Sequence, residues 1–110
     1  MPDAILRDPN LQTLLDRIVD AYDPERVYLF GSRATGTAHA DSDYDLLVVV
    51  PDDTPRDMLG PVAAWNRVVR GTGIAADVFP WRRGAFETYK DAVGTLSYEA
   101  SHNGRLVHGR

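Results

Sequence analysis

Hydrophobic residues recur with helical spacing near the start of the chain. Apolar side chains fall three and four positions apart between Leu11 and Tyr22, which predicts an amphipathic helix over 9–22. Asp8 followed by Pro9 is typical of an N-cap and a first-turn proline. After a Pro-containing break, the run Val-Tyr-Leu-Phe at 27–30 predicts a first strand.

A second apolar run indicates a strand in the middle of a sheet. Residues 44–50 predict this strand, and 46–50 are apolar at every position, which is typical of a strand covered on both faces. Residues 31–42, between the two strands, are small, polar and turn-like. Because this connection is short, we expect the two strands to be neighbours in the sheet.

The second half of the chain predicts further helices and strands. We expect a helix over 56–70 with Thr54 as its N-cap, and Pro61 either kinks this helix or marks its true start. Its expected inward residues include Met58, Leu59, Val62, Ala63 and Val69. A strand at 74–80, helices near 87–91 and 96–102, and a tail at 105–107 follow. The pattern predicts one α/β or α+β domain over 1–110, with a small mixed sheet of three to four strands flanked by helices.

Composition narrows the classes of function. The 110 residues are 44% hydrophobic and 25% charged, as expected of one globular domain. The absence of cysteine excludes disulfides, thiolate zinc sites and a cysteine nucleophile. A net charge of −4 disfavours nucleic acid as a direct partner. No apolar run has membrane-spanning length and no signal segment is evident, so we expect a cytoplasmic protein without membrane contact.

Candidate chemistry is concentrated around the second predicted strand. Asp43 and Asp45 lie two residues apart, so period two places both carboxylates on one face, with backbones about 6.5–7 Å apart. Such hard oxygen ligands suit magnesium. Gly31 and Ser32 close the preceding strand, where a backbone can approach a phosphate, and Arg33 could add a cation. Each feature alone is also common in turns.

The two features together are far more specific. Gly31-Ser32, ten residues and then Asp43-x-Asp45 resembles the motif of the DNA polymerase beta-like nucleotidyltransferase superfamily, in particular its minimal nucleotidyltransferases. The resemblance extends to an aspartate on the third predicted strand, Asp77, and to a late Glu-Ala pair before a tail strand. It implies the polymerase beta-like nucleotidyltransferase fold for nearly the whole chain.

The resemblance also implies a role for each residue of the motif. Gly31, Ser32 and Arg33 would bind the triphosphate, Asp43 and Asp45 would bind the nucleotide and two Mg²⁺ ions, with Mn²⁺ as a substitute, and Asp77 would complete the catalytic and metal-binding triad. The residues themselves leave two interpretations of Asp77. A carboxylate inside an apolar strand is expected to be paired or metal-bound, whereas on an edge strand it would face water.

The implied activity is transfer of AMP from ATP to a hydroxyl, with a tyrosine of a partner protein as the expected acceptor. Stand-alone members of this family pair, as antitoxins, with helical HEPN ribonuclease toxins, so the resemblance implies a hetero-oligomer. About thirty residues follow Asp77, too few for a domain that holds an acceptor. Two alternatives remain open: a toxin-binding antitoxin without catalysis, and a small-molecule nucleotidyltransferase completed by a separate helical subunit.

Overall fold

Four strands form a single mixed sheet. The computed structural model describes residues 5–37 and 42–109. The strands are β1 (Arg26–Phe30), β2 (Tyr44–Val50), β3 (Ala76–Arg82) and β4 (Arg105–Gly109), in the order β3-β2-β1-β4. β1 pairs antiparallel with β2 and β4, whereas β2 and β3 are parallel. The predicted α+β architecture is confirmed, as is the pairing of the first two strands.

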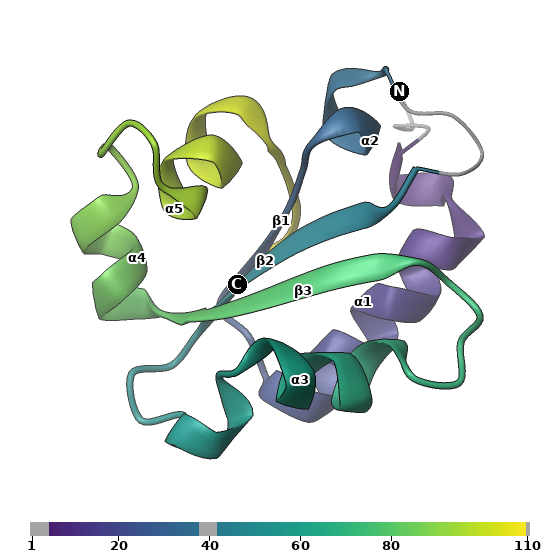
Figure 1. The fold of residues 1–110 in the computed structure, drawn as a ribbon, viewed down its shortest axis with the longest axis horizontal. Coiled ribbons are helices and arrows are strands. Elements are labelled where there is room, and N and C mark those ends of the chain that lie inside the picture. The colour runs from purple at the N-terminus through teal and green to yellow at the C-terminus, as the bar shows by residue number, and fades with distance from the viewer. Residues whose placement is uncertain (1–4, 38–41, 110) are drawn as a thin grey trace.

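Helices cover both faces of this sheet (Figure 1). One face carries α1 (Pro9–Tyr22) and α3 (Pro61–Ala64), which continues into the π-helical turn η3 (Trp65–Val69). The opposite face carries α4 (Arg83–Tyr89) and α5 (Leu96–Tyr98), which continues into the π-helical turn η4 (Glu99–Asn103). The short helix α2 (Ser32–Thr35) follows the end of β1. Two 3-10 turns, η1 (Ile5–Arg7) and η2 (Arg56–Met58), complete the described elements.

The first helix forms as its sequence pattern predicts. The Asp8 carboxylate accepts hydrogen bonds from the backbone N–H groups of Asn10 at 2.9 Å and Leu11 at 3.4 Å, which confirms the N-cap. The buried residues of α1 follow the predicted apolar stripe, and they pack on the sheet with side chains of β1, β2 and η3. This packing fixes the position of α1 behind the first residues of β2.

A second, smaller core lies on the other face of the sheet. Phe30, Leu47 and Val49 pack there against Phe86 of α4 and Ala100 of η4. Residues 46–50 are at most 2% exposed, because they alternate between the two cores. The prediction that this strand is covered on both faces is confirmed.

The predicted single helix over 56–70 is wrong. The segment begins with η2, and the helix proper starts at Pro61 because a proline inside a helix would remove a hydrogen bond and clash with the preceding turn. Thr54 caps no helix: it is buried, and its carbonyl accepts a hydrogen bond from Arg82 at 2.9 Å. Val62, expected to face inward, is 73% exposed, because Ala64, Val68 and Val69 form the buried face of this segment.

Other boundaries shift by a few residues. The third strand begins at Ala76 rather than residue 74, since the Ile74 N–H is bound by the Thr72 hydroxyl in a turn before the strand. The helix predicted at 87–91 begins at Arg83, and the tail strand extends to Gly109. Within the turn-like segment 31–42, residues 32–35 form α2, and 38–41 lie outside the described residues.

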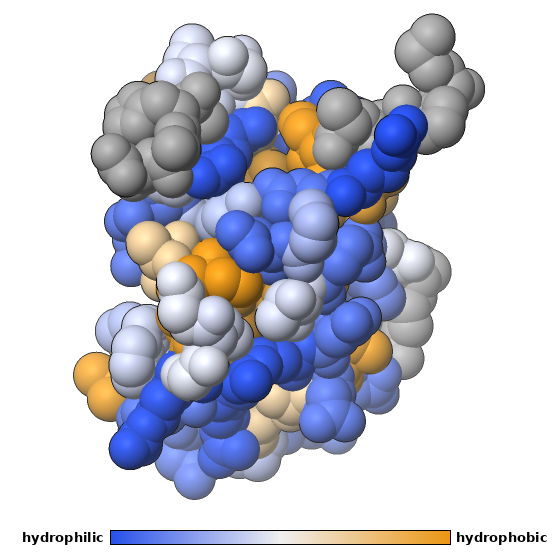
Figure 2. Space-filling view, turned by 90° about the vertical axis from the view of Figure 1, so that its right-hand side faces the viewer, coloured by the Kyte–Doolittle hydropathy of each residue, from blue (hydrophilic) through white to orange (hydrophobic). Residues whose placement is uncertain are grey.

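The outer surface of the molecule is predominantly polar on the side shown in Figure 2. Apolar areas on this side are small and separated by hydrophilic side chains. Among the described residues, none of the helices combines the length and apolar character needed to cross a bilayer.

Candidate active site

The turn after β1 requires a glycine. Gly31 has φ +76° and ψ −159°, a backbone conformation that is essentially restricted to glycine. Its carbonyl accepts hydrogen bonds from the N–H groups of Ala34 at 3.1 Å and Thr35 at 3.2 Å, which start α2. A Cβ atom at Gly31 would collide with Oδ2 of Asp45. The turn therefore lies directly against the carboxylate of β2.

The sheet register brings two of the three candidate aspartates together. Asp45, the second residue of β2, is the direct partner of Asp77, the second residue of β3, in the parallel ladder. On its other side Asp45 pairs with Phe30, the residue before the Gly31 turn. Asp43 lies immediately before β2. The structure thus gathers the predicted glycine turn and the predicted carboxylates at one end of three adjacent strands.

All three carboxylates belong to the same face of the sheet. Side chains alternate along a strand, so Asp43 and Asp45 share a face with Leu47 and Val49 of the smaller core. Asp77 shares that face with Phe79, which packs against the same core. The helices α4 and α5 lie at the far end of this face, away from α2 (Figure 1).

Electrostatic repulsion links the three carboxylates. Partial burial raises the pKa of Asp45, and the negative charges of Asp77 and Asp43 raise that pKa further. Asp43 and Asp77 are themselves exposed. The expectation of a buried Asp77 is wrong because β3 is an edge strand, as the alternative interpretation held. The register nevertheless places Asp77 beside Asp45.

Such a donor set fits a magnesium ion that is shared with a substrate. Within residues 5–37 and 42–109, no three acidic or histidine side chains lie close enough to hold a metal ion by themselves. Magnesium in phosphoryl-transfer sites needs only one or two carboxylates, because waters and substrate phosphates supply the rest of its shell. The mutual repulsion around Asp45 is the kind of arrangement that a divalent cation would relieve.

We expect Asp45→Asn to raise the thermal stability of the metal-free protein at neutral pH. Because folding raises the Asp45 pKa above its ordinary value of 3.8, the folded state binds this proton more tightly than the unfolded chain does. Ionised Asp45 therefore lowers stability above the raised pKa, and this cost disappears as the pH falls to 3.8. Melting curves from neutral to acid pH should show a gain that narrows on acidification. The exposed Asp53→Asn is the control; an equal gain there would contradict the expectation.

Arg33 and Tyr44 contact each other. Arg33 Nε donates to the Ser42 carbonyl at 2.9 Å, and its guanidinium lies 4.0 Å from the centre of the Tyr44 ring. These contacts lie beside the start of β2, so the predicted phosphate contact of Arg33 is not tested by them.

The sequence analysis did not single out Tyr44. Its position between Asp43 and Asp45 was the available signal, since alternation directs it to the opposite face, toward α1.

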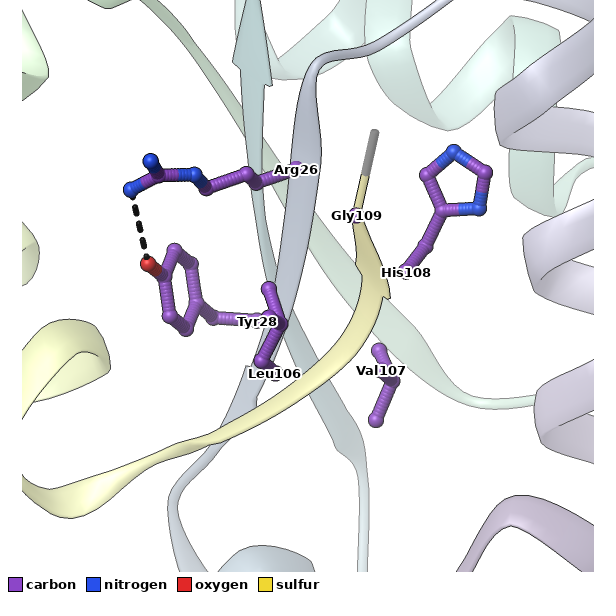
Figure 3. A pocket seen from close by; sticks show the side chains of 6 residues that line it. All are labelled: Arg26, Tyr28, Leu106, Val107, His108 and Gly109. Carbon is purple, nitrogen blue, oxygen red and sulfur yellow. Dashed lines mark hydrogen bonds between the residues drawn. The ribbon is translucent and has the colours of Figure 1, made fainter.

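Two of the hollows that the described residues form lie outside the carboxylate cluster. One, of about 550 Å³, lies between β1 and β4 and is lined by Arg26, Tyr28 and the four residues 106–109 (Figure 3). Arg26 donates to the Tyr28 hydroxyl there at 3.5 Å. The other, of about 240 Å³, is lined by Arg33, Ser42 and Tyr44 among others. Neither lining includes one of the three aspartates.

Comparisons with known proteins agree with this geometry. The family model for the nucleotidyltransferase domain matches residues 11–108. A search of curated proteins found no match to the sequence. A solved structure described as a toxin–antitoxin with AMP-PNP aligns at a TM-score of 0.63 and 19% identity, covering 90% of this chain and 73% of the other. A second structure, a Sulfolobus solfataricus protein provisionally assigned as a nucleotidyltransferase, aligns at a TM-score of 0.59 and 22% identity, covering 99% and 91%.

The structural likenesses, both below 25% identity, show a shared fold. The family match shows more than the fold, because it is a match of sequence that contains β1, the Gly31 turn, β2 and β3 with all three aspartates. On this evidence of sequence and fold, the chain is a member of the nucleotidyltransferase domain family.

Proposed function

We propose that this protein transfers AMP from ATP to a hydroxyl group of a partner protein, with a tyrosine as the expected acceptor. The observation that supports this most strongly is the register of Asp45 with Asp77 beside the Gly31 turn. A glycine turn for phosphates next to a cluster of carboxylates matches the needs of phosphoryl-type transfer, in which positioning and charge stabilisation carry most of the catalysis.

Each residue of the cluster has a distinct role in this proposal. Gly31 lets the backbone approach the triphosphate, and Ser32 contributes its N–H and hydroxyl as donors. Asp43, Asp45 and Asp77 would hold two Mg²⁺ ions, or Mn²⁺ in their place. When bound, these ions supply polarisation of the α-phosphate and neutralise charge on the departing pyrophosphate. Asp77 also orients the acceptor hydroxyl and accepts its proton as the new P–O bond forms.

The acceptor would come from another polypeptide. Among the described residues after Asp77, α4 packs against β2 and β3, and η4 packs against β1. The aligned toxin–antitoxin structure with AMP-PNP supports both a nucleotide substrate and a protein partner. We propose that the partner is a helical HEPN-type toxin, that the two proteins form a hetero-oligomer, and that the reaction takes place in the cytoplasm, where ATP is available.

Magnesium together with ATP should stabilise the fold. Binding to the folded state alone contributes about 2.7 kcal/mol when the ligand is at a hundredfold excess over its dissociation constant. For a domain of this size the thermal midpoint would rise by about 10 °C or more. Differential scanning fluorimetry with magnesium and ATP tests this. The Asp43→Asn/Asp45→Asn variant should show little shift, and an equal shift in the variant would argue against the proposed metal site.

A further inference from the structure

A network of three side chains lies on the face of the sheet opposite the carboxylates. We call it the Arg33 network: Arg33 contacts the Ser42 carbonyl and the Tyr44 ring, and the Tyr44 hydroxyl donates to Oδ2 of Asp8 at 2.5 Å. Asp8 is also the N-cap of α1, through its other carboxylate oxygen. The network therefore joins α2, the start of β2 and the start of α1.

The network contacts Ser42 and Tyr44, the residues next to the candidate metal ligands. Ser42 directly precedes Asp43, and Tyr44 separates Asp43 from Asp45. Tyr44 is 3% exposed, so its ring is held tightly in the larger core. Its N–H also donates to the Ala75 carbonyl at 3.0 Å, which connects it to the segment that leads into Asp77.

A hollow beside Arg33 makes its hydrogen bond to the Ser42 carbonyl difficult to replace. The hollow of about 240 Å³ adjoins Arg33, Ser42 and Tyr44. Since this space is not filled by neighbouring side chains, shortening Arg33 enlarges an existing hollow and leaves the Ser42 carbonyl without this donor. The segment 42–44 would then lose a contact that fixes the backbone position of Asp43.

We propose that Arg33 is a positioning residue that holds Asp43 and Asp45 in place for metal binding by fixing Ser42 and Tyr44 from behind. This inference rests on the proposed function, because it assigns these aspartates a metal. It differs from the role implied by the family resemblance, in which Arg33 contacts the triphosphate directly. The two roles predict different consequences for metal binding without nucleotide.

The test measures Mn²⁺ binding to the nucleotide-free protein by electron paramagnetic resonance, well below the unfolding temperature. Removing groups that orient metal ligands typically weakens metal affinity by about 10–100-fold. Arg33→Ala should weaken Mn²⁺ binding by about tenfold. Arg33→Lys should weaken it similarly, because lysine keeps the charge but not the Nε donor or the planar group over Tyr44. Tyr44→Phe, which keeps the ring, should cause a smaller loss. Arg56→Ala, an exposed arginine on η2, is the matched control and should bind Mn²⁺ like the wild type.

Three results would overturn the inference. If Arg33→Ala weakens ATP binding but leaves Mn²⁺ binding unchanged, Arg33 is a phosphate ligand. If the variants only lower the thermal midpoint and bind Mn²⁺ like the wild type, the network is merely structural. If wild-type protein and the Asp43→Asn/Asp45→Asn variant bind Mn²⁺ equally well, the proposed metal site itself fails, and the positioning role fails with it.

Discussion

Replacing Asp43 and Asp45 with asparagine should reduce AMP transfer by about a thousandfold or more. The two carboxylates are the proposed means of holding the ions that stabilise the charge of the reaction, a contribution of several kcal/mol. A loss of about 4 kcal/mol of transition-state stabilisation corresponds to about a thousandfold in rate. The measurement is transfer of label from α-labelled ATP to the partner protein.

The double variant needs a control with the same change in net charge. Asp16→Asn/Asp20→Asn removes two negative charges from the exposed side of α1 and should retain wild-type transfer. Because both residues lie on the solvent side of the helix, their replacement leaves the sheet edge unchanged. A comparable loss in the control variant would mean that general electrostatics, rather than the cluster at β2, governs the reaction.

Gly31→Ala should damage both stability and activity. The backbone conformation of Gly31 costs a non-glycine residue about 1–3 kcal/mol, and the added Cβ would displace the Asp45 carboxylate. A displacement of about 1 Å in such a site can reduce the rate by about a hundredfold. Denaturant unfolding and the labelled-ATP assay measure the two effects separately.

Gly36→Ala provides a matched comparison for this prediction. Gly36 also has a positive φ, +82°, but a Cβ there would meet no atom within 4 Å. Its replacement should lower stability by about 1–2 kcal/mol through backbone strain alone and leave transfer close to wild type. If both variants lose transfer equally, the contact between Gly31 and Asp45 has no special role.

Local pattern was sufficient to predict several elements of this fold. The apolar stripe and the Asp8–Pro9 pair predicted both ends of α1, since a helix of 14 residues is determined largely by its own periodicity and caps. The continuous apolar run predicted β2 and its coverage on both faces. Pro61, by contrast, left two interpretations, and the π-helical turn at Trp65–Val69 has no simple sequence signal.

The candidate site was predictable only in part, because some of its contacts depend on residues that are distant in the sequence. Gly31, Asp43 and Asp45 are close in sequence, so one motif could identify all three. The place of Asp77 depends on the register of β2 with β3 and on β3 being an edge strand, which long-range pairing determines. The contact between Tyr44 and Asp8 spans 36 residues, and nothing in the local sequence of either residue indicates the other.

The most direct test of the central claim is the intact mass of the partner protein. The chain would be co-expressed with its candidate toxin partner, supplied with ATP and magnesium, and the partner weighed by mass spectrometry. The proposal predicts that the partner gains one or more AMP units with the wild-type protein and none with Asp43→Asn/Asp45→Asn. A partner that stays unmodified, yet is bound and silenced equally by both proteins, would contradict it and identify the chain as a binding antitoxin.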